Sequence, residues 1–469
     1  MEKTSIKKGV LVICLIAAAL LPACSGGRKA GETDAPSQSV AALPPVQAPT
    51  AQPPTESAAA PPVPSHPAAP PASAAPPVPS QAVPPSTAPA TAAPAPSHPA
   101  APSASAVPSS PPSPGASGNS PAPSASAGGD SAASAEGYTK YSADYVDLFD
   151  TYTTFIAFTK SKEEFDRISG VVYARMSELD KLYDIYNNYG GVNNLKTVND
   201  NAGAAPVAVS RDIIDLVKRG ILTYQVTEGS VNIALGPVIA LWHDARVQTD
   251  GGGPAYIPPM DDLRAAALNT DINNVIVDED KGTVFLKNKG MALDVGAIAK
   301  GFATNLVIED AKKAGLVSGI LNAGGNVVSV GKPMDGRQRW GVGIEDPASV
   351  FAGGNDTIDV IYQDDGAVIT SGSYERYFTV NGKNYNHIID PETLQPADRF
   401  SSVTILLPDS GLADMLSTAL FILPRDRGEA ILKRWGAEAM WVTPDEKMYA
   451  TDGYKRISKT FSDYSASDK

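Results

Sequence analysis

The chain has 469 residues, a formal net charge of −13 and two cysteines, Cys14 and Cys24. An acidic chain of this kind is not expected to bind nucleic acid, because nucleic-acid binding depends on clustered Lys and Arg. If the first residues are a cleaved signal and Cys24 is capped, the mature protein has no free thiol, which excludes disulfides, thiol nucleophiles and cysteine-ligated metal sites.

Residues 1–23 have the form of a secretion signal. Three lysines precede an apolar run over residues 10–21, which is too short to span a bilayer as a stable helix. The segment ends in Leu21-Pro22-Ala23-Cys24, which resembles a bacterial lipoprotein cleavage box. The resemblance implies cleavage before Cys24 and acylation of its sulfur, for example with palmitate. We therefore expect a lipid-anchored protein on the extracytoplasmic face of the cell membrane; the alternative is plain secretion with cleavage nearby.

Residues 24–137 consist mostly of Pro, Ala and Ser, with hardly any large apolar side chain. Such a segment cannot bury enough surface to offset the entropy lost on ordering. We predict a disordered linker that holds a folded domain, residues 138–469, away from the membrane surface.

The first part of the folded domain has signals for strands and helices in turn. Residues 145–158, rich in Thr, Tyr, Phe and Val, predict a strand. Ser161 and Glu164 have the spacing of a capping box, and apolar residues follow them at helical intervals. Residues 187–203 predict a loop, because Asn and Gly dominate, and Ser210 predicts the start of a second helix.

The middle of the domain has a predicted hairpin and two glycine-containing turns. Residues 271–286 predict a hairpin, and residues 291–295 predict a strand that feeds a helix closed by Gly315. A second short strand, residues 316–321, leads into Asn322-Ala323-Gly324-Gly325-Asn326. Backbone N–H groups exposed at such turns suit phosphate, and an exposed carbonyl suits a hard cation.

The last part has further strands and a helix with polar residues on one face. Residues 340–344, 367–374 and 403–407 predict strands. Asp414, expected to be exposed near the start of the helix, lies four residues before Thr418, so their oxygens can share one small cation. Trp242 is expected to fill the core. The mixture of hairpins and helices predicts an α+β class and not a doubly wound sheet.

Five motifs in this order resemble those of the ApbE family, the FAD:protein FMN transferases: Asp294 to Gly301, Asn322 to Asn326, Thr370 to Tyr374, His387 to Pro391 and Asp414 to Thr418. The resemblance covers the folded region. It implies a single T-fold-like domain of mixed or antiparallel sheets with packed helices. It also implies an activity: FAD binds with Mg²⁺, and its FMN half is transferred to a Thr or Ser hydroxyl of an acceptor protein, such as an extracytoplasmic electron-transfer protein, releasing AMP.

The resemblance also assigns the site residues. The implied metal ligands are the backbone carbonyl of Ala297 and the side chains of Asp414 and Thr418. The implied FAD contacts are Ser230, Val231, Asn232, Asp294 and Lys300. His387 is expected near the pyrophosphate as the catalytic residue. It could take the proton of the attacking hydroxyl or bear positive charge beside the phosphates, and the sequence leaves both roles open.

The chain departs from the family pattern at three places. It has Val231-Asn232 where the family commonly has an aromatic-acid pair, Ser373 where the family usually has Asp, and Leu394 where the family usually has Gly. The family's acceptor motif is absent, so the protein is expected to modify other proteins. Two other functions stay open: a non-catalytic FAD-binding lipoprotein, and an FAD pyrophosphatase that yields AMP and FMN.

Overall fold

The computed structural model describes residues 137–462, and the predicted signal, Cys24 and nearly all of the predicted linker lie outside the described residues. An antiparallel eight-stranded sheet forms its centre, in the order β1-β2-β6-β7-β10-β15-β16-β17. These strands are β1 (Thr139–Leu148), β2 (Thr151–Thr159), β6 (Gly319–Ala323), β7 (Asn326–Val330), β10 (Gly366–Gly372), β15 (Ser402–Leu407), β16 (Glu438–Val442) and β17 (Met448–Ala450).

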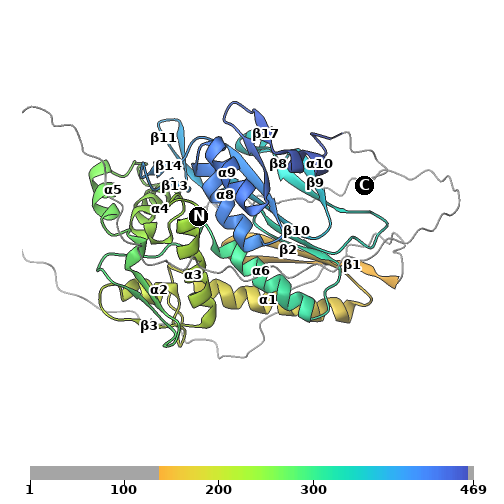
Figure 1. Cartoon of the computed structure of the whole chain (residues 1–469), viewed down its shortest axis with the longest axis horizontal. Helices are drawn as coiled ribbons and strands as arrows, with labels where there is room; N and C mark the ends of the chain where they lie inside the picture. The colour runs from red at the N-terminus through yellow and green to blue at the C-terminus, as the bar shows by residue number, and fades with distance from the viewer. Residues whose placement is uncertain (1–136, 463–469) are drawn as a thin grey trace, which may run out of the picture. The chain divides into compact units, whose positions relative to one another are not determined.

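The sheet has a packed layer on each face, because successive side chains of a strand point to opposite sides. In β2, Phe155 belongs to one apolar cluster and Ile156 to another. Helices α1 (Lys162–Tyr183), α6 (Ala299–Lys313) and α8 (Ser410–Ile422) lie side by side over the first face (Figure 1). The hairpin of β8 (Trp340–Glu345) and β9 (Thr357–Gln363), with α10 (Asp452–Ile457), covers the second face.

The remaining elements surround these layers. A small sheet in the order β3-β5-β4 packs with α2 and α3, and the hairpin β11-β12 packs on α4. The bounds are α2 (Leu195–Asp200), β3 (Val207–Ala208), α3 (Arg211–Val226), α4 (Gly236–Asp250), α5 (Met260–Ala267), β4 (Val275–Asp278), β5 (Thr283–Leu286), α7 (Pro347–Phe351), β11 (Tyr377–Val380), β12 (Lys383–Asn386), β13 (Ile389–Asp390), β14 (Gln395–Pro396) and α9 (Arg425–Trp435), with short 3₁₀ turns Ile233–Leu235 and Ile272–Asn274.

Several predictions from the sequence are confirmed, the α+β class among them. Ser210 caps α3, and β4 and β5 form the predicted hairpin. Gly315, at a φ of 98°, ends α6, since the next amide, of Leu316, donates back to the carbonyl of Ala311. Trp242 is buried and its ring stacks on Tyr385.

Two element boundaries were predicted wrongly near the start of the domain. Residues 145–158 form parts of two strands, because Phe149 and Asp150 adopt φ values of 53° and 51° and reverse the chain. The predicted loop 187–203 contains α2, which Asn194 and Thr197 cap reciprocally. The capping box at Ser161 is also incomplete: the Glu164 carboxylate accepts from the amide of Lys160.

Residues 291–295 are not a strand, although their composition favours one. The amide and carbonyl of Leu293 bond to the side chain of Asn199, at 2.7 and 2.9 Å. The Asn199 side chain thus takes the place of a neighbouring strand.

The start of α8 was also predicted wrongly. This helix begins at Ser410, after the cap Asp409, so Asp414 lies inside the helix and not at its start. The segment after β6 is a hairpin turn, with Gly324 and Gly325 at φ values of 55° and 85°.

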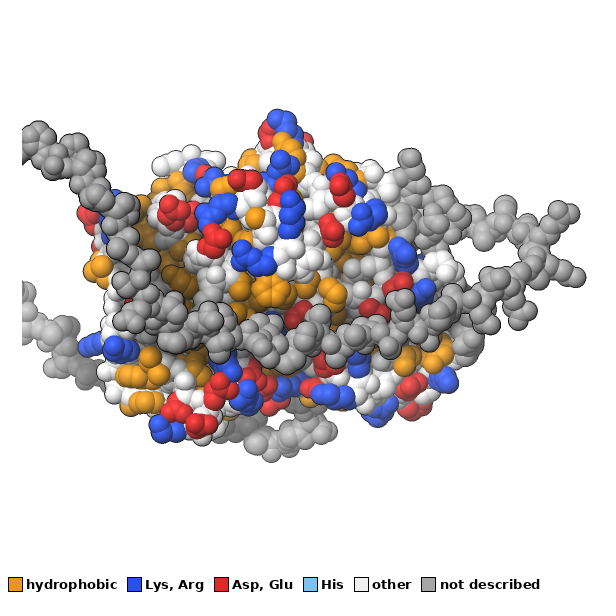
Figure 2. Space-filling view, in the orientation of Figure 1, with side chains coloured by type: hydrophobic (Ala, Val, Ile, Leu, Met, Phe, Trp, Pro, Cys, Tyr) orange, Lys and Arg blue, Asp and Glu red, His pale blue; other side chains and the backbone are white. Residues whose placement is uncertain are grey.

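The visible surface of the described part mixes side chains of both charges with apolar ones (Figure 2). No helix within residues 137–462 is both long and apolar enough to cross a membrane.

Candidate active site

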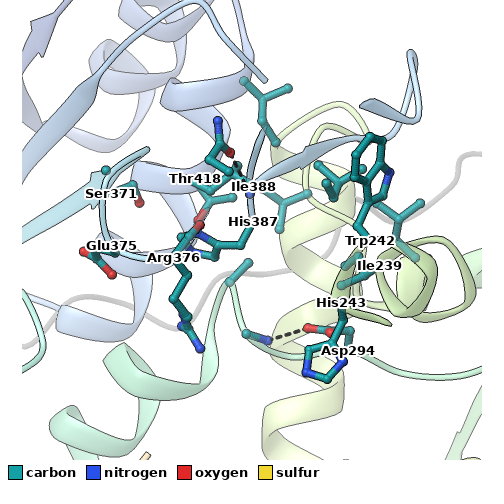
Figure 3. Close-up of a pocket in the computed structure, with 18 of the residues that line it drawn as sticks. Ile239, Trp242, His243, Asp294, Ser371, Glu375, Arg376, His387, Ile388 and Thr418 are labelled. Atoms are coloured by element: carbon teal, nitrogen blue, oxygen red, sulfur yellow. Dashed lines mark hydrogen bonds between the residues drawn. The ribbon is translucent and has the colours of Figure 1, made fainter. Parts of the chain in front are cut away.

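One pocket collects the nine pocket residues expected from the sequence: Ser230, Val231, Asn232, Asp294, Ala297, Lys300, His387, Asp414 and Thr418. Its space, including the part open to solvent, is about 1250 Å³. In Figure 3, His387, Arg376 and Thr418 lie on one side, and Trp242, His243 and Asp294 lie on the other. Cys24, the remaining site residue expected from the sequence, lies outside the described residues.

The close contact of α6 with α8 brings the expected metal ligands to the pocket. A Cβ atom on Gly301 would lie 2.3 Å from the Cβ of Asp414 and 2.5 Å from the carbonyl oxygen of Ser410. Only glycine permits this approach. One turn along, the hydroxyls of Thr304 and Ser410 bond at 2.8 Å.

The same contact completes the hydrogen bonding at the start of α6. The amide of Gly301 donates to Oδ2 of Asp414 at 2.7 Å. Gly301 is the third residue of α6, so its amide has no partner within the helix and Asp414 supplies one. Ala297 lies just before the helix and lines the pocket, where its carbonyl can act as a ligand. With a carboxylate and the Thr418 hydroxyl it makes an all-oxygen set, which suits a hard cation such as Mg²⁺. Residues 137–462 hold no group of three or more His, Cys, Asp or Glu placed to bind a metal.

Asp414 is buried, with 5% of its surface exposed, and the expectation that it is exposed was wrong. It sits inside α8 and is covered by the start of α6. Loss of hydration raises the pKa of its carboxyl to about 6, while the charge of Lys300, the Gly301 amide and Asn326 act in the opposite direction. A cation at this place would favour the ionised carboxylate.

His387 is held as a neutral imidazole. Its Nδ1 lies 3.2 Å from the carbonyl oxygen of Arg376. Because a carbonyl can only accept, Nδ1 carries the proton and Nε2 is left as an acceptor. Loss of hydration and the positive charges of Arg376 and Lys300 lower the pKa of His387 to about 3.

The side chains of the segment 230–232 are largely used by their own loop. Asn232 accepts from the amide of Ala234 and donates to the carbonyl of Thr270, both at 2.9 Å. The hydroxyl of Ser230 donates to Thr227, and Val231 is buried. This segment therefore offers a ligand mainly backbone groups and apolar surface.

Asp294 faces the pocket from the loop before α6. Its carboxylate accepts from the amide of Gly296 at 2.9 Å (Figure 3). Loss of hydration raises the pKa of Asp294, and the positive charge of Arg376 opposes that rise.

Sequence reasoning missed several polar or aromatic residues of the pocket wall, among them Tyr186, His243, Arg246, Glu375 and Arg376. Glu375 and Arg376 directly follow the motif that ends at Tyr374, so extending that motif would have found them. Tyr186 and His243 stack with ring centroids 4.9 Å apart, and no spacing in the sequence signals that contact.

The backbone conformation of Leu394 shows why the family usually has Gly at this position. Its φ is 60°, a left-handed conformation that glycine adopts without strain. The indole N–H of Trp242 donates to the Leu394 carbonyl at 3.0 Å and helps to hold this turn.

The ApbE family matches residues 149–441. The chain belongs to the ApbE family. The FAD:protein FMN transferase of Treponema pallidum is 34% identical over 273 residues, which cover 55% of this chain and 73% of the relative. That of Klebsiella pneumoniae is 32% identical over 299 residues, covering 63% and 90%.

Solved structures of the ApbE family share the fold. The ApbE protein of Thermotoga maritima superposes with a TM-score of 0.60 at 26% identity, covering 68% of this chain and 99% of that one. The flavin transferase ApbE of Vibrio cholerae gives a TM-score of 0.57 at 24% identity, with the same coverage.

Proposed function

We propose that this ApbE-family protein is an enzyme that, with Mg²⁺, transfers the FMN moiety of FAD to a Thr or Ser hydroxyl of an acceptor protein and releases AMP. Membership of the family and the names of its relatives support the reaction class. The observation that carries the proposal is the meeting of an all-oxygen ligand set, Lys300 and a neutral His387 in one pocket.

The pocket residues divide the chemistry among them. The Ala297 carbonyl, Asp414 and Thr418 would hold Mg²⁺, which neutralises charge on pyrophosphate oxygens. Lys300 adds a fixed positive charge beside the same group. Nε2 of His387 accepts the proton of the acceptor hydroxyl while the oxygen of that hydroxyl forms a bond to the FMN phosphorus. The bond from that phosphorus to the bridging oxygen breaks, and AMP leaves with the bridging oxygen.

The neutral state of His387 favours the role of base over that of a fixed cation. A group with a pKa of about 3 carries no charge near neutral pH. Two negative phosphates beside the ring would raise that pKa toward the range in which a base works well.

The predicted location belongs to the same proposal. Acylation at Cys24 and a long Pro-, Ala- and Ser-rich linker would hold the enzyme at the extracytoplasmic face of the membrane, close to acceptor proteins there. Each buried methylene of an acyl chain adds roughly 0.8 kcal/mol to anchoring, so two or more chains would anchor the protein firmly.

The deciding experiment incubates the mature protein with FAD, Mg²⁺ and an acceptor protein that carries the family's acceptor motif. We expect a mass increase of one FMN on the acceptor, with AMP released in equal amount. FAD binding without AMP release would favour a non-catalytic binder. AMP and FMN released without any acceptor, and no mass increase, would favour a pyrophosphatase.

A further inference from the structure

Glu375 forms an ion pair with Lys300 that the reaction outlined above does not use. The Nζ atom of Lys300 lies 4.0 Å from Oε2 of Glu375, and the two side chains are 12% and 25% exposed. Nζ also donates to the carbonyl of Gly324 at 3.3 Å. The ammonium thus has one neutral and one charged partner, both beside the turn between β6 and β7.

The Glu375 carboxylate packs against the backbone of the turn between β6 and β7. A Cβ atom on Gly325 would lie 3.4 Å from Oε1 of Glu375, so the carboxylate rests against the bare backbone of this turn. Gly325 has a φ of 85°, which favours glycine. The β6-β7 turn therefore brings together two side chains that are 75 residues apart in the numbering, Lys300 and Glu375.

Asp414 is the competing partner for Lys300. Both residues line the same pocket, together with Glu375. Yet Lys300 forms its ion pair with Glu375. If Lys300 moved onto Asp414, it would occupy the oxygen that the proposed cation needs.

We propose that Glu375 is a positioning residue that holds the Lys300 ammonium against the β6-β7 turn, away from Asp414, so that Lys300 meets the pyrophosphate of FAD. This inference rests on the proposed function, because it takes FAD as the ligand. The proposal and simple charge repulsion predict opposite changes in FAD affinity when the charge of Glu375 is removed. A carboxylate near an anion site repels the anion, so removing its charge should tighten FAD binding. Loss of a positioning residue should weaken FAD binding.

The experiment measures FAD dissociation constants in EDTA, by flavin fluorescence, for Glu375→Gln, Glu375→Asp, Lys300→Met and the double variant Glu375→Gln/Lys300→Met. We expect Glu375→Gln to weaken FAD binding about fivefold, or ~1 kcal/mol. Glu375→Asp should restore part of the loss. In the Lys300→Met background, Glu375→Gln should have no weakening effect. Unchanged or tighter binding by Glu375→Gln, or equal weakening without Lys300, would overturn the proposal.

Glu309→Gln is the matched control. Glu309 pairs with Lys312 at 3.1 Å toward the C-terminal end of α6, the helix that carries Lys300 near its start. It makes the same charge change outside the pocket, and we expect unchanged FAD binding. A transfer assay on the wild type separates the two proposals. FAD binding without FMN transfer would refute the proposed activity and leave the positioning test valid. A wild-type protein that binds no FAD would overturn both.

Discussion

Asp414 lies at the contact between two helices and also faces the pocket. Its spacing from Thr418 predicted that the two share a helix face, and both do line the pocket. Its burial could not be predicted, because it depends on the amide of Gly301, 113 residues earlier in the chain. Asp414 is therefore both a candidate ligand and a cap for α6.

The two roles of Asp414 can be separated by comparing Asp414→Asn with Asp414→Ala, with FMN transfer measured in Mg²⁺ and stability measured in EDTA. Asn keeps an oxygen for the Gly301 amide, whereas Ala leaves that buried amide unpaired, which costs about 1–3 kcal/mol. We expect both variants to lose FMN transfer. In urea unfolding, the Ala variant should be the less stable of the two. Equal stability would show that Asp414 does not cap α6.

The raised pKa of Asp414 also gives a pH dependence. The folded state binds this proton more tightly than the unfolded state, whose Asp pKa is about 3.9. Stability should therefore fall as pH rises from about 4 to about 6, the folded-state pKa, and the loss should be complete above it. Asp414→Asn should lack this part of the pH dependence and be at least as stable as the wild type near neutral pH.

His387 should contribute more to turnover than to binding. Its motif was found in the sequence, but its tautomer depends on the carbonyl of Arg376, which only the structure reveals. For His387→Ala we expect kcat to fall about a hundredfold or more. The dissociation constant for FAD, measured by flavin fluorescence, should change much less. The opposite order would make His387 a binding residue only.

At the scale of elements, helix periodicity predicted that helices follow Gly296 and β15, but not that they touch. Periodicity shows which face of a helix is apolar and does not identify the partner. The strand predicted at residues 291–295 was wrong for a related reason. Its backbone groups bond to the side chain of Asn199, a contact that no local pattern predicts.

The α6–α8 contact predicts that Gly301→Ala is strongly disruptive. The added methyl would overlap Asp414 and Ser410, which should cost about 3 kcal/mol of unfolding free energy. It should also weaken binding of Mn²⁺, a Mg²⁺ substitute measured by electron paramagnetic resonance, because Ala297 and Asp414 move apart.

The matched control is Gly170→Ala, in the middle of α1, where a Cβ atom would meet nothing within 4 Å. There Ala should stabilise by roughly 0.5–1 kcal/mol, since Gly is the poorer helix former. If Gly301→Ala proved as harmless as Gly170→Ala, the tight helix contact would be refuted.

At the scale of the whole molecule, the sequence predicted the α+β class and most strands but not their order. Neighbours such as β2 and β6 pair across more than 150 residues of chain, and local patterns carry no signal for such a pairing. The pocket was predicted through a resemblance of motifs and not through geometry. Its unforeseen residues, such as His243, come from elements outside those motifs.

The predicted anchor gives a test on the whole protein. Cys24→Ser should abolish incorporation of labelled palmitate and release the protein from the membrane fraction. Cys14→Ser, inside the predicted signal, is the control and should leave both unchanged. Palmitate incorporated by the Cys24→Ser protein would refute the assignment of Cys24.

The pocket joins α6, α8 and the β12–β13 segment, which come from distant parts of the chain. A bound dinucleotide would therefore contact all three segments at once. Binding of FAD should slow backbone hydrogen exchange in the three segments together. A partly folded chain, in which only some of these segments are packed together, would have an incomplete pocket and would not consume FAD. Consumption of FAD would therefore show that folding is complete.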